Sequence, residues 1–224
     1  MTSELAIDEI VTVPLTLDTP TAGVANTGEE VVYTLPALQG LVDVRVTGAT
    51  TPTVKLLRSN GLDPVTEAVA VDGHLFWADA SNLPLFVSVS NAGAFTITAS
   101  QRLRTTATPE VEPNEPPSSE VIAAGDGISG TLGGADTVDA WRFDATAGAK
   151  VFAVTLPLTG SIYQLTGTLA IRDSNGTLLQ SDNTSGDGFY PGIYGFAIPA
   201  DGSYSLELSA SSTGNYVLFF DIDP

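Results

Sequence analysis

Cysteine is absent from this chain of 224 residues, and its absence excludes several kinds of chemistry at once. Without a thiol the chain forms no disulfide, no cysteine nucleophile and no thiolate metal site. The only histidine is His74, so a zinc site built from two or three histidines is also excluded. His74 follows Gly73, where a turn is expected, and no Gly-x-Ser-x-Gly motif occurs. We therefore expect a surface histidine and no Ser-His-Asp triad.

Positive charge is also scarce. Lys and Arg together number 8 against 26 Asp and Glu, which gives a formal net charge of −18. Binding to nucleic acid needs clustered cations that displace counterions, so nucleic acid is excluded as a partner, and anionic membrane surfaces are excluded for the same reason. The partners that such a surface permits are cations such as Ca²⁺ and neutral polymers.

The chain has no apolar stretch near the ~20 residues that a membrane-spanning helix needs. It nevertheless contains 43% hydrophobic residues, which is enough to build a buried core. The length allows one large domain or two small ones. No secretion leader is visible before the first apolar segments, and we expect that the leader of an exported precursor has been removed.

Apolar and polar residues alternate along many short runs, and turn residues separate these runs. Examples are Val42 to Thr47, Trp141 to Asp144 and Ser203 to Ser209. A period of two places the apolar residues on one face of a strand and the polar residues in water. Trp77 and Trp141 are expected in the core. No helical stripe longer than two turns is present, so the sequence predicts an all-β protein.

The segment from Thr105 to Ser119, TTATPEVEPNEPPSS, has four prolines and no apolar alternation. It is typical of an interdomain linker. The halves on either side resemble diverged copies, because Val31–Leu35 resembles Trp141–Ala145 and Gly93–Ile97 resembles Gly214–Leu218. We predict a first domain at 1–104, a proline-rich acidic linker at 105–119 and a second domain at 120–224. A short linker of this kind allows either a rigid tandem or a hinge.

The second half also resembles a known family. The ordered features are EVEPNE at 110–115, ISGTL at 128–132, DTVDAWRF at 136–143, DSNGTLL at 173–179, DGSY at 201–204 and GNY at 214–216. This set is similar to the bacterial pre-peptidase C-terminal domain family. The first half resembles a degenerate copy, because it lacks the Glu-x-Glu-Pro-Asn opening and the aspartate pair.

The resemblance implies two tandem jelly-roll-like antiparallel β-sandwich domains. Domains of this family typically follow the catalytic domain of secreted bacterial proteases and other exported proteins. Some relatives bind collagen or polysaccharide, some bind Ca²⁺, and many have no known ligand. The resemblance therefore implies a secreted or cell-surface bacterial protein, and we expect a monomer.

A candidate Ca²⁺ site begins in the linker, where acidic and amide side chains alternate on an extended segment. Ca²⁺ takes 6–8 oxygen ligands, preferably from carboxylates and carbonyls. By resemblance to collagen-binding members, the hairpin that carries Asp136 and Asp139 packs against this segment. The family usually has Asp where this chain has Glu115. The other interpretation is a solvated acidic linker. The predicted ligands are Glu110, Glu112, Asn114, Glu115, Asp136 and Asp139.

Two further groups are candidates. Asp182, Asn183 and Asp187 could hold a cation, although such a loop is more often plain turn chemistry. Tyr163 and Tyr190 lie in Pro- and Gly-rich loops, where exposed rings could stack on sugars or grip an extended chain. The alternative for both tyrosines is burial in the core, as is expected for Tyr194 and Phe196.

The sequence contains no set of residues that favours catalysis, and we expect no enzyme. The leading hypothesis is a non-catalytic extracellular accessory or binding module of a secreted or surface bacterial protein. The alternatives are a Ca²⁺-dependent adhesin that binds matrix protein or polysaccharide, and a purely structural or secretion-associated spacer. The expected partners are an extracellular protein or polysaccharide.

Overall fold

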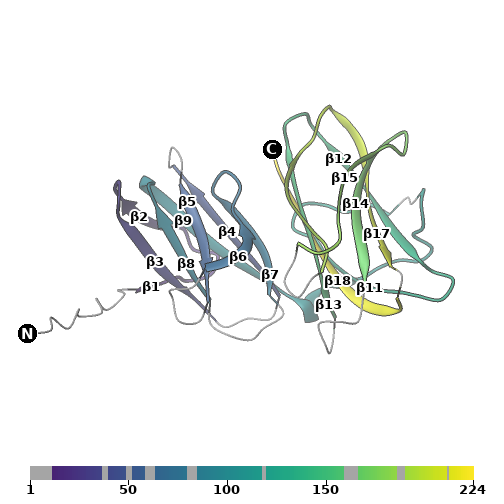
Figure 1. The fold of residues 1–224 in the computed structure, drawn as a ribbon, viewed down its shortest axis with the longest axis horizontal. Helices are drawn as coiled ribbons and strands as arrows, with labels where there is room; N and C mark the ends of the chain where they lie inside the picture. Colours follow the sequence, from purple (N-terminus) through teal and green to yellow (C-terminus); the bar gives the residue numbers. More distant parts are fainter. Residues whose placement is uncertain are drawn as a thin grey trace, which may run out of the picture.

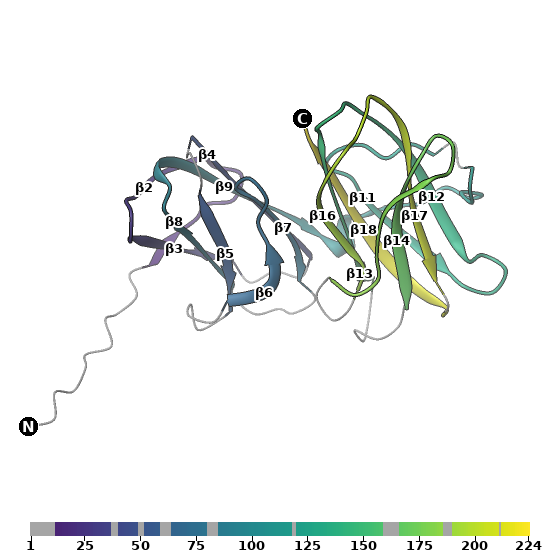
Figure 2. The same cartoon turned by 45° about the horizontal axis from the view of Figure 1, so that its top comes forward.

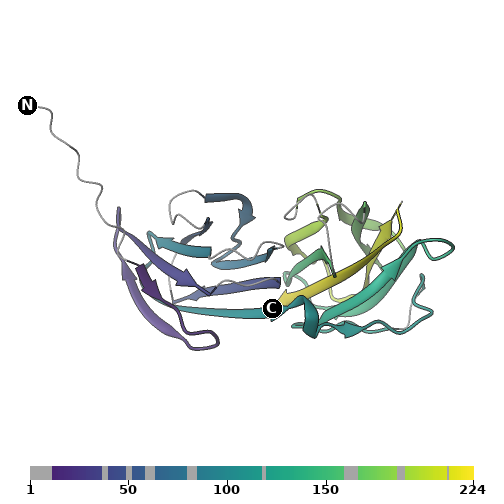
Figure 3. The same cartoon turned by 90° about the horizontal axis from the view of Figure 1, so that it is seen from below.

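The computed structural model describes residues 12–36, 40–48, 52–58, 64–79, 85–117, 120–158, 166–185, 190–210 and 212–224. The described elements are eighteen strands and one short 3-10 turn, η1 (Arg104–Thr106). Among them is no helix that is long and apolar enough to cross a membrane. The strands form two β-sandwiches that lie side by side, and β9 leads from the first toward the second (Figures 1 and 3).

The first sandwich contains β1 to β9. One of its sheets has the strand order β1-β3-β8-β5-β6, and the other has the order β2-β9-β4-β7. Apart from the parallel pair β1 and β3, neighbouring strands are antiparallel. The strands are β1 (Thr12–Pro14), β2 (Thr21–Ala25), β3 (Glu30–Leu35), β4 (Gly40–Thr47), β5 (Thr53–Leu57), β6 (Pro64–Val69), β7 (His74–Asp79), β8 (Leu85–Ser90) and β9 (Gly93–Leu103).

The second sandwich contains β10 to β18. Its sheets have the orders β10-β11-β18-β13-β16 and β12-β17-β14-β15. Only the pair β10 and β11 is parallel among its named strands. The strands are β10 (Thr108–Pro109), β11 (Gly127–Leu132), β12 (Val138–Ala145), β13 (Lys150–Pro157), β14 (Gly167–Asp173), β15 (Leu178–Asp182), β16 (Gly192–Ala197), β17 (Gly202–Ala210) and β18 (Gly214–Asp223).

The two sandwiches have the same strand connectivity. The order β2-β9-β4-β7 corresponds to β11-β18-β13-β16, and β3-β8-β5-β6 corresponds to β12-β17-β14-β15. The similar segments found in the sequence fall on equivalent strands, β3 with β12 and β9 with β18. The bridge between Val121 and Arg142 is parallel, as is the pairing of β1 with β3. The prediction of an all-β fold with two tandem sandwiches is therefore confirmed.

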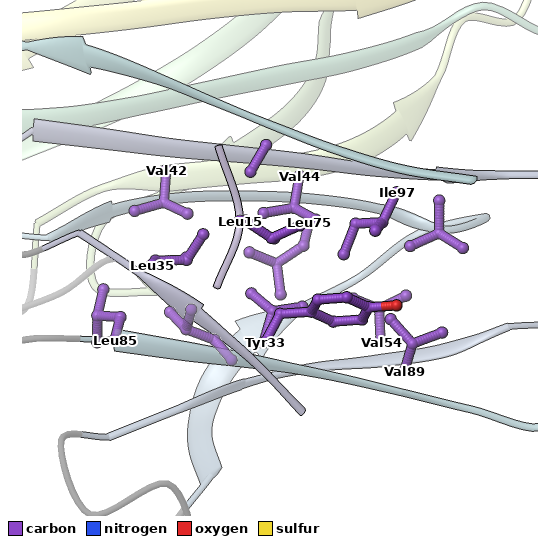
Figure 4. Close-up of a cluster of buried hydrophobic side chains, with 14 of the residues drawn as sticks. Leu15, Tyr33, Leu35, Val42, Val44, Val54, Leu75, Leu85, Val89 and Ile97 are labelled. Carbon is purple, nitrogen blue, oxygen red and sulfur yellow. The ribbon is translucent and has the colours of Figure 1, made fainter. Parts of the chain in front are cut away.

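Each sandwich has its own hydrophobic core, built from the inward side of the alternating strands. In β17 the buried residues are Tyr204, Leu206 and Leu208, as the alternation predicts. Figure 4 shows the core of the first sandwich, where Tyr33 lies among aliphatic side chains from both sheets. Trp77 and Trp141 are 2% and 0% exposed, which confirms that both belong to the core.

A third apolar cluster lies between the two sandwiches. Strands β13 and β18 are buried on both faces, because alternate residues point to their own core and to the first sandwich. The residues of this cluster are Leu41, Phe76 and Ala78 from β4 and β7, with Phe152, Val154, Leu156, Val217 and Phe219 from β13 and β18. In Figure 2, β7 lies on the side of the first sandwich that faces the second. The two sandwiches are therefore in direct contact.

The proline-rich segment is fastened to the second sandwich. Thr108 and Pro109 pair with β11, and the carbonyl of Asn114 accepts a hydrogen bond from the Ala140 amide at 2.8 Å. The Glu110 amide donates to the Ser129 carbonyl at 2.9 Å. These contacts place the acidic residues of the segment against β11 and β12. The boundaries 1–104, 105–119 and 120–224 stay a prediction.

Candidate functional site

Glu110 is held at a fixed position above β11. Its Oε1 accepts a hydrogen bond from the Thr131 amide at 3.0 Å, and its Oε2 accepts one from Asn114 Nδ2 at 3.1 Å. Gly130 leaves the room for this carboxylate, because a Cβ at that position would lie 2.3 Å from it. A glycine in β11 is thus what allows the side chain to lie flat on the strand.

Three carboxylates meet here. Ligand oxygens of Glu110, Glu112 and Asp139 lie within 4.8 Å of one another. Glu112 is exposed, Glu110 is half-buried and Asp139 is 0% exposed, so the group runs from solvent into the protein. The Asn114 amide donates to Glu112 Oε2 at 3.1 Å, which ties the turn of the segment to the group.

Several acceptor oxygens around this group are buried and have no hydrogen-bond partner. They are Asn114 Oδ1, Asp136 Oδ1 and Asp139 Oδ1. Asn114 is itself 0% exposed. A buried polar atom without a partner is unfavourable and rare in folded proteins. These acceptors lie beside three carboxylates and are oxygen donors that a cation could bind.

Asp136 and Glu115 lie at the edge of the same group. Burial raises the pKa of Asp136, and the negative charges of Glu110 and Glu115 raise it further. Glu115 is exposed. Of the six residues predicted as Ca²⁺ ligands, Glu110, Glu112 and Asp139 place ligand oxygens within 4.8 Å of one another. Asn114 is hydrogen-bonded to Glu110 and Glu112, whereas Asp136 and Glu115 lie outside that group of three.

Tyr216 links two of the carboxylates, and sequence reasoning did not assign it to the site. Its hydroxyl contacts Glu110 Oε2 and lies 2.6 Å from Asp139 Oδ2. Burial, with the charge of Asp139 as a second cause, raises the pKa of Tyr216. The hydroxyl thus keeps its single proton. The Gly-Asn-Tyr motif in β18 was the signal that could have identified it.

One hydroxyl proton cannot serve two ionised carboxylates, because an ionised carboxylate only accepts hydrogen bonds. Both contacts can be hydrogen bonds at the same time only if the second is donated to the Tyr216 oxygen by a protonated Asp139. Burial raises the pKa of Asp139 to about 8, and the charges of Glu110, Asp136 and Glu112 add to this while the Tyr216 hydrogen bond opposes it. Asp139 is therefore the carboxyl that holds the proton near neutral pH.

The spacing of these oxygens fits a shared ion. Two ligands on one Ca²⁺ are at most twice the metal–oxygen distance apart, which is about 5 Å. The observed separations stay within that limit. A hard cation such as Ca²⁺ prefers carboxylate and amide oxygens, which are the donors present here.

A second acidic group differs in its surroundings. Asp43, His74 and Asp221 also place ligand atoms within 4.8 Å of one another. However, Arg45 and Arg102 both contact Asp43 and Asp221 at 2.9–3.6 Å. Since protein cations already balance these carboxylates, this group is an ion-pair network and not a metal site.

The structure corrects the prediction for His74. The residue is 3% exposed and begins β7, whereas the sequence predicted a surface histidine in a turn. Gly73 does lie in the turn just before it, with φ +82°. The ring is buried because this end of β7 is covered by the second sandwich: its centroid lies 4.2 Å from that of Phe152.

The remaining candidates give mixed outcomes. Tyr190 is 1% exposed and belongs to the core, so the prediction that its ring is free to bind a ligand is wrong. Tyr163 and Asp187 lie outside the described residues. Asp182 accepts hydrogen bonds from the amides of Thr184, Ser185 and Gly192 at 2.9–3.0 Å. Its carboxylate is thus used by its own loop, as turn chemistry predicts.

The second sandwich also carries two open grooves. One, of about 550 Å³, is lined by Asp144, Ala145, Thr146, Ala149, Gly202, Ser203, Ile222 and Pro224. The other, of about 310 Å³, is lined by Pro116, Pro117, Ala140, Arg142, Asp173, Ser174, Gly176, Ser203, Tyr204, Ser205 and Glu207. Pro116 and Ala140 of this smaller groove directly follow Glu115 and Asp139 in the chain, but successive residues of a strand point to opposite faces, so Ala140 and Asp139 lie on different faces of β12.

No family model matches the chain, and no curated protein matches it in sequence. Among solved structures, the chain is similar to a chain in the crystal structure of plant peptide RALF23 in complex with FER and LLG2. The TM-score is 0.26 and the identity 12%, and 92% of this chain and 89% of that chain are covered. The chain is also similar to the CBM22-1-CBM22-2 tandem domain of Xyn10C from Paenibacillus barcinonensis, with TM-score 0.25, 11% identity, and 91% and 86% of the two chains covered.

Proposed function

We propose that this chain is a non-catalytic accessory module of a secreted or cell-surface bacterial protein, and that it binds Ca²⁺ through Glu110, Glu112, Asn114 and Asp139. The observation that carries the proposal is the group of buried, unpartnered acceptor oxygens beside carboxylates less than 5 Å apart. The proposal includes membership of the pre-peptidase C-terminal domain family for the second half, supported by the ordered motifs from EVEPNE to GNY.

The Ca²⁺ ion would fasten the proline-rich segment to the second sandwich. Glu110, Glu112 and Asn114 come from the segment, whereas Asp139 comes from β12. An ion held by both parts adds a bond that the unfolded chain lacks, so binding stabilises the folded state by mass action. The module would be more rigid in the Ca²⁺ concentrations outside cells than in chelator.

Two observations support a non-catalytic role. Both ring nitrogens of His74 are hydrogen-bonded to carboxylates, so the only histidine has no free nitrogen to act as a base. The carboxyl with the most strongly raised pKa, Asp139, is fully buried and lines neither of the two described grooves. A catalytic acid must reach its substrate, whereas a metal ligand can be buried.

The test is Ca²⁺ titration followed by calorimetry and by thermal unfolding. We expect saturable binding of one ion by the wild type and a rise in Tm over chelator. Glu110→Gln and Asp139→Asn should remove both effects. Glu30→Gln is the matched control, because it removes one negative charge from β3 of the first sandwich, where Glu30 is exposed and paired with Lys55. Equal Ca²⁺ responses in all variants would overturn the proposal.

A second candidate function is a Ca²⁺-dependent adhesin. It is favoured by the groove of about 310 Å³, whose wall at Pro116 and Pro117 continues the cation-binding segment. In this case the ion would set the position of the wall, and a polysaccharide or an extended protein chain would lie in the groove across Arg142. A screen of glycans and matrix proteins in Ca²⁺ and in chelator, with wild type and Arg142→Ala, tests this candidate. Binding that ignores both changes would exclude this groove.

A further inference from the structure

The contact between the two sandwiches contains a charge network centred on His74. The imidazole Nε2 lies 3.0 Å from Asp43 Oδ1 in β4 of the same sandwich. The Nδ1 lies 2.7 Å from Asp223 Oδ2 in β18 of the other sandwich. The ring therefore bridges a carboxylate of each sandwich with one nitrogen on each side.

This geometry fixes the protonation state of the ring. Ionised carboxylates only accept hydrogen bonds, and a neutral imidazole has a single N–H donor. Both contacts can be hydrogen bonds at once only when both nitrogens carry a proton. The arrangement thus requires the imidazolium cation. Whichever tautomer formed on deprotonation, one carboxylate would face a lone pair.

The charges around the ring also favour the protonated form of His74. Its near neighbours are three carboxylates, Asp43, Asp221 and Asp223, and two guanidinium groups, those of Arg45 and Arg102. A protonated His74 brings the cations to three, against these three carboxylates and Asp126, whose charge also acts on Arg102. Lys150 of β13, which lies opposite Asp223 in the sheet register, is paired with Asp72.

We propose that His74, in its protonated form, locks the two sandwiches in one relative arrangement, and that loss of this proton at alkaline pH loosens the contact between them. The network spans the contact, since Arg45 binds Asp221 and Asp223, and Arg102 binds Asp221 and the Phe220 carbonyl. The apolar cluster around Phe76 and Phe152 has no side chain that titrates, so the two sandwiches should stay in contact at alkaline pH and shift to a second arrangement, not separate.

The direction of the pH effect follows from the histidine. Burial lowers the pKa of His74, but the hydrogen bonds to Asp223 and Asp43 outweigh burial, so that the pKa is raised above its usual value. A group whose pKa is raised by folding stabilises the fold fully below its unfolded pKa, and this stabilisation is lost as the pH rises through the folded value. The stabilisation of the contact by His74 is thus complete in mild acid and weakest at alkaline pH.

Because His74 is the only histidine, its ring can be titrated by NMR without assignment. Because cysteine is absent, the double variant Val24→Cys with Leu178→Cys places one spin label on an exposed position of each sandwich. We expect the imidazole ring to titrate above the ordinary histidine pKa of ~6.5. The single narrow distance between the labels should change to two populations, with the same pH midpoint as the ring. His74→Phe, which keeps an aromatic ring against Phe152, should show both populations at every pH.

Several results would contradict the proposed role of protonated His74. A ring that is neutral at about pH 6, below its ordinary pKa, would contradict the imidazolium bridge. A ring that titrates while the label distance stays constant would contradict the coupling. Should His74→Phe fail to fold, the wild-type titration and distances decide alone. Asp139 also has a raised pKa, so Asp139→Asn tests which group controls the contact. If His74 controls it, the label distances of this variant should change with pH as they do in the wild type.

Discussion

Two groups of carboxylates in this molecule have opposite surroundings. At the contact between the sandwiches, Asp43, Asp221 and Asp223 face two arginines and a histidine. Beside β12, Glu110, Glu112 and Asp139 face each other and a tyrosine hydroxyl. The first group is balanced by cationic side chains of the protein, whereas no ion pair among the described residues involves the second. The same residue type therefore serves an internal contact in one place and, in our proposal, a Ca²⁺ site in the other.

Removing a charge should therefore change the free energy of unfolding in opposite directions in the two groups of carboxylates. The largest effect is expected for Arg102→Ala. Arg102 contacts Asp43 and Asp221, donates to the carbonyls of Asp126 and Phe220, and lies over the rings of Phe76 and Phe219. Removing it leaves two buried carboxylates short of a partner, and the free energy of unfolding should fall by about 3–5 kcal/mol.

Denaturant unfolding measures this loss. The control is Arg142→Ala, because Arg142 is exposed and takes part in none of the ion pairs found among the described residues. That change should alter stability by less than about 0.5 kcal/mol. If both variants lost the same amount, the network at the contact would not be what balances the first group of carboxylates.

The second prediction is that Asp139→Asn, unlike Arg102→Ala, raises the free energy of unfolding when Ca²⁺ is removed by chelator. The pKa of Asp139 is raised to about 8, so its charged form is disfavoured in the folded state. Such a group destabilises the fold as the pH rises from its unfolded value toward the folded one. At about pH 8 the asparagine variant should be more stable than the wild type by roughly 1–3 kcal/mol, and near pH 4 the two should agree.

Added Ca²⁺ should reverse this order, because only the wild type has the full set of ligands. Thermal unfolding at the two pH values, with chelator and with Ca²⁺, measures both halves of the prediction. An asparagine variant that is less stable than the wild type in chelator at alkaline pH would show that the carboxylates are balanced by something other than an added cation.

Much of the second group could be predicted from the sequence, whereas the first could not. The six candidate ligands lie in motifs that are close in the sequence or carried by one hairpin. Alternation, by contrast, shows which residues share a face of a strand but not what covers that face. Asp43 and Arg45 were therefore assigned to solvent, and Asp43 is 7% exposed in the structure.

The sequence does contain a signal for the contact between the sandwiches. Residues 151–154 and 216–220 are continuous apolar runs, VFAV and YVLFF, without polar alternation. Runs of this kind are typical of strands buried on both faces. They could have indicated that β13 and β18 face a second layer. The partner residues on β4 and β7 lie more than 60 positions away in the chain, and no local pattern identifies them.

A third, smaller effect is expected for Gly130→Ala. The added Cβ would lie 2.3 Å from the Glu110 carboxylate and would displace it from the group. Ca²⁺ affinity should fall by about tenfold, which is ~1.4 kcal/mol. Gly202→Ala is the matched control, since its Cβ would meet only a Tyr204 ring atom at 4.0 Å. Calorimetric titration that gives equal affinities for the two variants would remove Glu110 from the ligand set.

The smallest effect is expected for Lys150→Met, although Lys150 also joins the two sandwiches. Its partner Asp72 has a side chain that is 76% exposed, whereas the side chain of Asp221, the partner of Arg45 and Arg102, is 10% exposed. Exposed ion pairs contribute about 0–1 kcal/mol, because water already solvates both charges. Lys55→Met, which removes the exposed pair with Glu30 inside the first sandwich, should give the same small change in denaturant unfolding. If Lys150→Met instead destabilised the protein as much as Arg102→Ala, the rim of the contact would hold the sandwiches together, and protonation of the buried His74 could not control their arrangement.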